Sequence, residues 1–320
     1  MVTDQTTQGL ALARVKSSPV GPIRALLLSG RDDAVLAVIA GVNGPSYRPV
    51  GAMMTVFDES ERVGSLSSGC IERDIALQAM RVRESGQPNV IRYGEGSPYV
   101  DIKLPCGGGV EILLLPKPDR TVLEEIVEQH RTRRTCVLEI DTCDGSMTCV
   151  AGGETGRVGS QLRVRIEPDI MFNVFGKGPE ASTFAALVQS AGYSGVLLSP
   201  DEETLAVGVS MGFTTRHLVS ARYPSDLDTD ERTAIVLFFH DHDWEPPILV
   251  SALNTQAFYV GAQGSRHARN NRIKAIEELG VLSADMERLK GPIGLIHSAR
   301  DPSTLAVSVL AEILSVAMGE

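Results

Sequence analysis

The chain has 320 residues, 43% of them hydrophobic and 22% charged, a balance typical of a soluble globular protein with roughly two domains. Its formal net charge of −10 argues against general binding to nucleic acid, because like charges repel. The first 20 residues are polar, so we expect neither a signal peptide nor a membrane span. Five cysteines, an odd number, argue against a disulfide framework and favour a cytoplasmic protein with reduced thiols.

The first half of the chain predicts short strands and helices in irregular order. After a loose tail at 1–20 we expect a helix at 22–29 and, at 34–42, a strand that is apolar throughout and therefore buried. Apolar residues at helical spacing predict an amphipathic helix at 71–84. The other expected elements are strands at 52–57, 110–115, 135–140, 146–150 and 161–166, a helix at 122–130, and a loop at 151–159.

From residue 170 onward, strand and helix patterns alternate. The expected strands are 170–175, 196–198, 234–239 and 258–260, and the expected helices are 179–191, 248–253, 267–279 and 303–317. Such alternation predicts a parallel, doubly wound sheet. We therefore expect an α/β protein with a mixed α/β domain at 21–168 and a Rossmann-like domain at 169–320.

A glycine-rich turn follows the predicted strand at 170–175 and opens a helix. In this G-x-G-x-x-A pattern Gly176 makes the tight turn, Gly178 lets the backbone approach a phosphate, and Ala181 packs helix on strand. The acidic residue that would hold a ribose at the end of the next strand is missing, and Asp201 comes two residues late. Binding of NAD, of another nucleotide-like anion, or of no ligand therefore all stay open.

Two cysteine motifs stand out in the first half. Cys70 precedes a predicted helix, whose dipole favours a thiolate, although from this motif alone a packed thiol is the slightly favoured interpretation. Cys106 stands before three glycines, whose amides can approach an anion or a sulfur atom, and we favour a functional role for it. The remaining cysteines, which show no metal-site spacing and are interpreted as packing residues, are Cys136, Cys143 and Cys149.

Polar residues also follow two later strands, at the sheet edge where open α/β folds bind ligands. His240 and Asp241 are candidate acid/base groups or metal ligands, and a solvated loop is the alternative. After the next strand come Gly264 and Ser265, a predicted helix cap, and arginines at 266, 269 and 272 that suit a phosphate. The turn at 291–294 and the helix start at Asp301 are interpreted as structural.

Segments at 44–51, 68–72, 106–108, 176–181, 259–266 and 292–313, in this order, resemble the XdhC/CoxI family over nearly the whole chain. The resemblance implies an N-terminal domain with the cysteine motifs, a C-terminal Rossmann-like domain, and a homodimer. It further implies that the protein binds molybdenum cofactor, as molybdopterin or its cytosine dinucleotide form. Family members protect this cofactor while a cysteine desulfurase adds sulfur, and deliver it to an apo molybdenum hydroxylase such as xanthine dehydrogenase.

The resemblance also implies which residues contact the cofactor. Cys106 is the first candidate and Cys70 the second. The other candidates are Gly107, Gly108, Arg48 and Glu72 around the thiols, and Gly176, Gly178, Ala181, His240, Asp241, Gly264, Ser265 and Arg266 for the phosphate or nucleotide part. Two further hypotheses stay open: an NAD(P)-linked oxidoreductase with His240 as acid/base, and a scaffold that holds a hydroxylase subunit.

Overall fold

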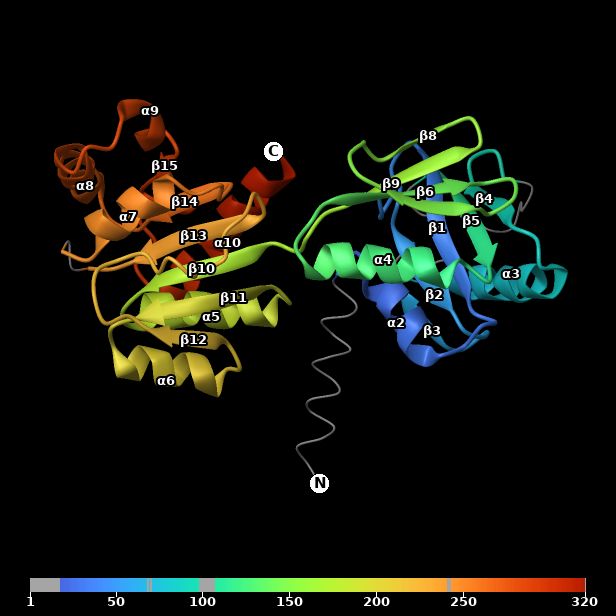
Figure 1. Cartoon of the computed structure of the whole chain (residues 1–320), viewed down its shortest axis with the longest axis horizontal. Coiled ribbons are helices and arrows are strands. Elements are labelled where there is room, and N and C mark those ends of the chain that lie inside the picture. The colour runs from blue at the N-terminus through green and yellow to red at the C-terminus, as the bar shows by residue number, and fades with distance from the viewer. Residues whose placement is uncertain (1–17, 68, 70, 98–106, 241–242, 320) are drawn as a thin grey trace, which may run out of the picture. The chain divides into compact units, whose positions relative to one another are not determined.

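The computed structural model describes residues 18–67, 69, 71–97, 107–240 and 243–319. The chain divides into two compact units, Met1–Pro168 and Asp169–Glu320 (Figure 1). The first contains two antiparallel sheets with helices, and the second contains one parallel sheet with helices on both faces. The predicted fold class, mixed α/β followed by a Rossmann-like sheet, is thereby confirmed.

The larger sheet of the first unit has the strand order β3-β2-β1-β5-β4 and the smaller one β7-β6-β9-β8. The larger sheet comprises β1 (Val35–Asn43), β2 (Met53–Val56), β3 (Arg62–Gly64), β4 (Asn89–Gly94) and β5 (Gly109–Pro116). The smaller sheet comprises β6 (Cys136–Asp141), β7 (Met147–Val150), β8 (Gly156–Val158) and β9 (Gln161–Ile166). The short strand β8 lies inside the segment that the sequence predicts to be a loop.

The central strand β1 is covered on both faces. Leu36 and Val38 pack into a core shared with α2 (Gly21–Ser29), α4 (Arg120–Arg131) and the smaller sheet. Val35 and Ala37 face the opposite way, into a core shared with α3 (Glu72–Ser85). This double burial explains why the strand is apolar throughout instead of alternating between apolar and polar residues.

The second unit is built on six parallel strands in the order β12-β11-β10-β13-β14-β15. They are β10 (Met171–Gly176), β11 (Ser194–Ser199), β12 (Thr214–His217), β13 (Thr233–Phe238), β14 (Tyr259–Ala262) and β15 (Leu289–Lys290). Counted along the unit, the order is 3-2-1-4-5-6, that of dinucleotide-binding folds. Strands are added toward one edge of the sheet up to β12 and toward the other edge from β13 onward. A ligand crevice is therefore expected at the carboxyl ends of β10 and β13, where the order of strands reverses.

Helices cover both faces of the parallel sheet (Figure 1). They are α5 (Pro179–Ser190), α6 (Glu202–Ser210), α7 (Glu245–Leu253), α8 (Arg266–Glu278), α9 (Ser283–Met286) and α10 (Pro302–Met318). Ala234 and Val236 of β13 share a core with α5 and α10, whereas Ile235 and Leu237 share another with α7 and α8. Within the described residues, none of the helices is both long and apolar enough to span a membrane.

Candidate functional site

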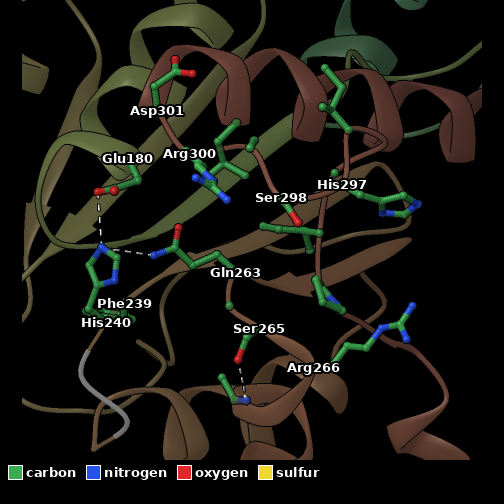
Figure 2. A pocket seen from close by; sticks show the side chains of 18 residues that line it. Glu180, Phe239, His240, Gln263, Ser265, Arg266, His297, Ser298, Arg300 and Asp301 are labelled. Carbon is green, nitrogen blue, oxygen red and sulfur yellow. Dashed lines mark hydrogen bonds and ion pairs between the residues drawn. The ribbon is translucent and has the colours of Figure 1, made fainter.

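A large cavity opens at the carboxyl edge of the parallel sheet, where β10, β13 and β14 end (Figure 2). Its volume is about 790 Å³, within the usual range for small-molecule sites. We call it the arginine pocket, after Arg266 and Arg300. Its lining residues are Glu180, Phe239, His240, Gln263, Gly264, Ser265, Arg266, Ala268, Pro292, Ile293, Gly294, Ile296, His297, Ser298, Ala299, Arg300, Asp301 and Leu305.

The positive charge of this pocket comes from two exposed arginines. Ser265 accepts a hydrogen bond from the Ala268 amide at 3.1 Å and so caps α8, as the sequence predicts. Arg266 begins that helix, and Arg300 lies in the loop before α10 (Figure 2). Neither guanidinium forms an ion pair with another of the described residues, so both charges and the α8 N-terminus are available to an anion.

The loop between β15 and α10 forms one wall of the arginine pocket. The amide of Ile296 donates to the Ser308 hydroxyl at 2.7 Å, and the amide of Gly294 donates to the Glu312 carboxylate. Ser298 has a φ of +61°, a left-handed conformation that costs energy for a residue with a side chain and is often found at functional sites. The loop that forms this wall is therefore held against α10 by hydrogen bonds.

The carboxylate of Asp301 accepts a hydrogen bond from the Thr304 amide at 2.8 Å, so the predicted cap of α10 is confirmed. However, Asp301 also lines the arginine pocket, as do Pro292 and Gly294. The structural role predicted for this segment is therefore present at the helix cap, and the segment lies at the pocket as well. The carboxyl ends of parallel strands line the crevice, and this segment directly follows the sixth strand, a position that the sequence did not reveal.

His240 lies beside the arginine pocket, with a side chain 71% exposed. Its Nε2 is 3.4 Å from Oε2 of Glu180 and 3.5 Å from Nε2 of Gln263 (Figure 2). Phe239 and His240 also line a second cavity of about 420 Å³, which we call the tryptophan pocket. The other residues that line it are Lys177, Gly178, Pro200, Asp201 and Trp244.

The glycine-rich turn packs as predicted. A Cβ on Gly176 would lie 2.8 Å from the Phe238 carbonyl oxygen and 2.9 Å from the Cβ of Ala181, which is fully buried. Two amides of the turn are already occupied inside the protein: Lys177 donates to the Phe238 carbonyl at 3.2 Å, and Gly178 donates to the Thr204 hydroxyl at 2.9 Å. The turn therefore keeps the shape of a phosphate loop, with fewer amides free for a phosphate.

The prediction that Arg272 binds a phosphate is wrong. Arg272 is 3% exposed, and it donates to both carboxylate oxygens of Glu245 at 2.9 and 3.0 Å and to the Gln263 carbonyl at 2.7 Å. Six residues after Arg266, it lies about 240° further round the helix and so faces the core. It positions the Gln263 turn at the pocket. Arg269 is not among the residues that line the pocket.

In the first unit, Glu72 organises the loop that leads toward position 70. It is 4% exposed, and its carboxylate accepts from the Ser67 hydroxyl at 2.6 Å, the Ser67 amide at 2.8 Å and the Ser65 hydroxyl at 2.8 Å. Burial alone would raise its pKa, but these hydrogen bonds lower the pKa to about 2. Glu72 is thus a buried anion whose hydrogen bonds stabilise its own loop.

Three predicted site residues lie outside the described residues: Cys70, Cys106 and Asp241.

The other predicted residues of the first unit lie on two loops. Gly108 packs so tightly that a Cβ would come 2.2 Å from the Pro45 carbonyl oxygen, whereas Gly107 is exposed with a φ of +73°. Arg48 is exposed and lines a cavity of about 460 Å³ together with Ser65, the residue held by Glu72. The arginine therefore borders the loop that Glu72 fixes.

Among the remaining cysteines, Cys136 is buried and Cys149 is half-buried, which agrees with a packing role. Burial raises the pKa of Cys136 to about 12, so its thiol stays protonated and unreactive. Cys143 is exposed, so the prediction that it packs in a core is wrong: it lies in the turn between β6 and β7. The described residues include no cluster of three or more histidine, cysteine, aspartate or glutamate side chains suited to a metal ion.

Sequence reasoning missed several pocket residues, namely Glu180, Gln263, His297, Ser298, Arg300 and Trp244. Glu180 lies inside the glycine motif, where a carboxylate is unfavourable for a phosphate, and that mismatch was a readable signal. His297 and Arg300 belong to a loop without a motif, and only its place after a parallel strand could have identified them.

Comparisons with known proteins cover both units. The family described as "XdhC Rossmann domain" matches residues 172–313, and "XdhC and CoxI family" matches residues 27–94. The molybdenum cofactor insertion chaperone PaoD of Escherichia coli strain K12 is 33% identical over 291 residues, which cover 91% of this chain and 85% of that protein. A protein of Bacillus subtilis strain 168, described as a probable subunit of xanthine dehydrogenase, is 25% identical over 90% of this chain and 94% of that protein.

A crystal structure described as a xanthine dehydrogenase from Bacillus halodurans shares the fold, with a TM-score of 0.77 and 18% identity. The match covers 95% of this chain and 96% of that chain, so the order of elements is the same along nearly the whole length. The identity to PaoD and the two family matches show that the chain belongs to the XdhC/CoxI family.

Proposed function

We propose that this protein is a chaperone for the molybdenum cofactor. In this proposal it binds the cofactor, protects it while a cysteine desulfurase adds sulfur, and delivers it to a molybdenum hydroxylase of the xanthine dehydrogenase type. The cofactor is cargo, so the protein has to bind and release it without chemical turnover.

The observation that carries the proposal is the arginine pocket of a chain that is 33% identical to a molybdenum cofactor insertion chaperone. The phosphate-bearing end of the cofactor is an anion, and Arg266, Arg300 and the capped N-terminus of α8 offer the charges and amides that bind such a group. The pocket is open to solvent on the side of these exposed arginines, so a cargo can enter and leave.

The molybdenum end requires different chemistry. Molybdenum in this cofactor is bound by sulfur, and a cysteine thiolate is a soft ligand that suits such a centre. We assign this role to Cys106 and, second, to Cys70, with Glu72 holding the loop that leads to Cys70 and Arg48 nearby. Both roles of the cysteines are part of the proposal, because their positions lie outside the described residues.

The test is retention of the cofactor. The full chain is expressed in a host that makes the cofactor and purified without oxygen, and bound pterin and molybdenum are quantified per protein. We compare wild type with Arg266→Ala, Arg300→Ala and Cys106→Ala. The matched control is Arg131→Ala, which removes an equally charged, 67% exposed arginine of α4 whose ion pair is with Glu128 of the same helix.

We expect wild type and Arg131→Ala to retain equal amounts of pterin. Each pocket arginine variant loses about tenfold or more in affinity, the usual cost of one charge-assisted hydrogen bond. Cys106→Ala lowers the molybdenum content more than the pterin content. The proposal fails if wild type retains no pterin, or if the pocket variants retain as much as the control.

The oxidoreductase alternative receives less support from the geometry. It requires a dinucleotide across the glycine-rich turn, where the amides of Lys177 and Gly178 are occupied and Glu180 adds a carboxylate. A scaffold role would predict binding of a hydroxylase subunit that survives the loss of Cys106, so pull-down with the Cys106→Ala variant separates it from the chaperone role.

A further inference from the structure

The tryptophan pocket is a second compartment at the sheet edge, apart from the arginine pocket. Its walls come from the segments that follow β10, β11 and β13: Lys177 and Gly178, then Pro200 and Asp201, then Phe239, His240 and Trp244. In a parallel sheet of this strand order, the first and second strands and the fourth form the nucleoside side of the crevice. At about 420 Å³ it has the size of a site for one small ligand.

One wall of this pocket is aromatic. The rings of Phe239 and Trp244 are stacked, with centroids 6.0 Å apart and an interplanar angle of 16°. Trp244 is half-buried at the start of α7, so part of its indole surface remains open to the pocket. A planar heterocycle gains dispersion and stacking energy on such a surface, whatever its hydrogen-bonding pattern.

The lining of the same pocket also includes an acceptor, Asp201, and a cation, Lys177. Asp201 caps α6 through Oδ2 alone, which accepts from the Thr204 amide at 2.8 Å and from the Thr204 hydroxyl at 2.5 Å. Hydrogen bonds from Thr204, and more weakly the charge of Lys177, lower the pKa of Asp201, so it is ionised at neutral pH. Its second oxygen is directed to no described partner and can accept from the hydroxyls of a ribose.

A pyrophosphate is poorly accommodated beside this compartment. The amides of Lys177 and Gly178 donate to the Phe238 carbonyl and the Thr204 hydroxyl, so the turn has few donors left for a bridging phosphate. Glu180 places a carboxylate at the N-terminus of α5, where it takes the helix dipole that a phosphate would use and repels a second anion. Phe239 and His240 line both pockets and so mark the boundary between them.

We propose that the tryptophan pocket binds a single ribonucleoside 5′-monophosphate unit, with its base against Trp244, its ribose hydroxyls on Asp201 and its phosphate near Lys177. This inference does not depend on the proposed function, because it concerns another cavity and free nucleotides test it. A dinucleotide that crosses the glycine-rich turn is the ligand class that the site disfavours.

The chain offers a direct probe, because Trp244 is its only tryptophan. The intrinsic fluorescence of the full-length protein, excited where nucleotides absorb little, is followed while AMP, GMP, CMP and UMP are titrated separately. Adenosine, deoxy-AMP and NAD⁺ serve as comparison ligands. The variants are Asp201→Asn, which keeps a good helix cap and removes the charge, Lys177→Ala, and, as the control, Arg131→Ala, which removes an exposed arginine of the first unit that lines neither pocket.

We expect saturable quenching by at least one ribonucleotide. Asp201→Asn should weaken it about tenfold or more and deoxy-AMP should bind less tightly than AMP, since each loses a charge-assisted hydrogen bond. Lys177→Ala should abolish the preference for AMP over adenosine, and Arg131→Ala should leave binding unchanged. The inference is overturned if no monophosphate quenches at millimolar concentration, if Asp201→Asn binds equally well, or if NAD⁺ binds more tightly than every monophosphate.

Discussion

The buried carboxylate of Glu72 predicts a specific dependence of stability on pH. Its pKa falls from an ordinary value of 4.5 to about 2 in the folded protein, which corresponds to about 3 kcal/mol of free energy of unfolding at neutral pH. Because the folded-state pKa is lower than the unfolded one, this contribution is complete well above pH 4.5 and is lost as the pH falls toward 2. At pH 3 about 1.5 kcal/mol should remain.

The perturbation is Glu72→Gln, which keeps the shape of the side chain and removes its charge. The amide of the variant has one acceptor oxygen and cannot accept at both positions from Ser67 and Ser65, so we expect the variant to be less stable at pH 7 by about 3 kcal/mol. Between pH 7 and pH 3 the difference from wild type should shrink by about 2 kcal/mol, because protonation of Glu72 imitates the mutation in the wild type.

Denaturation by urea, followed by far-UV circular dichroism, measures both proteins at each pH. The two units can unfold in separate transitions. Trp244 lies in the second unit, so its fluorescence follows the unfolding of that unit. A transition seen by circular dichroism but not by fluorescence is assigned to the first unit, which contains Glu72. A difference between the two proteins that stays constant from pH 7 to pH 3 would refute the charge argument. A change in the tryptophan transition would show that the units are coupled.

Three further outcomes follow from the second unit. Gly176→Ala should lower its stability by about 1–3 kcal/mol, since the added Cβ would clash with the Phe238 carbonyl; an unchanged midpoint in the Trp244 fluorescence melt contradicts this. Arg272→Met should cost about 3–5 kcal/mol by removing the buried positive charge that faces the Glu245 carboxylate, and adding Glu245→Leu should restore much of the loss in a double-mutant cycle. Asp201→Ala should cost about 1 kcal/mol through the lost α6 cap, whereas Asp201→Asn should cost less, as chemical denaturation can measure.

Periodicity made most of the architecture predictable. The apolar strand at 34–42 and the alternation after residue 170 correspond to β1 and to the parallel sheet, because burial on both faces leaves a continuous apolar run in the sequence. The elements that were missed include α6, whose small hydrophobic residues lack a clear stripe, and β12, which reads Thr-Thr-Arg-His. The others are the short helix α9 and the edge strands β3, β4, β8 and β15. Edge strands bury little, so their sequences carry little signal.

The site was less predictable than the fold. Gly264, Ser265 and Arg266 line the arginine pocket because they follow a parallel strand, a rule that sequence position can apply. The prediction for Arg272 failed because the arginines at 266, 269 and 272 were treated as one basic face of the helix. The rotation of the helix between Arg266 and Arg272 turns Arg272 toward the core, where it binds Glu245. Arg300 and Trp244 were missed because neither belongs to a motif, and the two-residue strand β15, which precedes the loop of Arg300, was itself not predicted.

The exposure of the pocket arginines is itself informative about how a cargo would be released. A buried pair such as Arg272 with Glu245 is scarcely screened by salt, whereas Arg266 and Arg300 face solvent, where the Debye length is about 8 Å at physiological ionic strength. Under the proposed function, cofactor held at its phosphate end should therefore dissociate as salt increases. Dialysis of the loaded protein against rising salt should release pterin progressively from wild type, and Arg266→Ala should show a shallower dependence. If retention does not change with salt, the affinity comes chiefly from the thiol end, and the arginines orient the cargo without holding it.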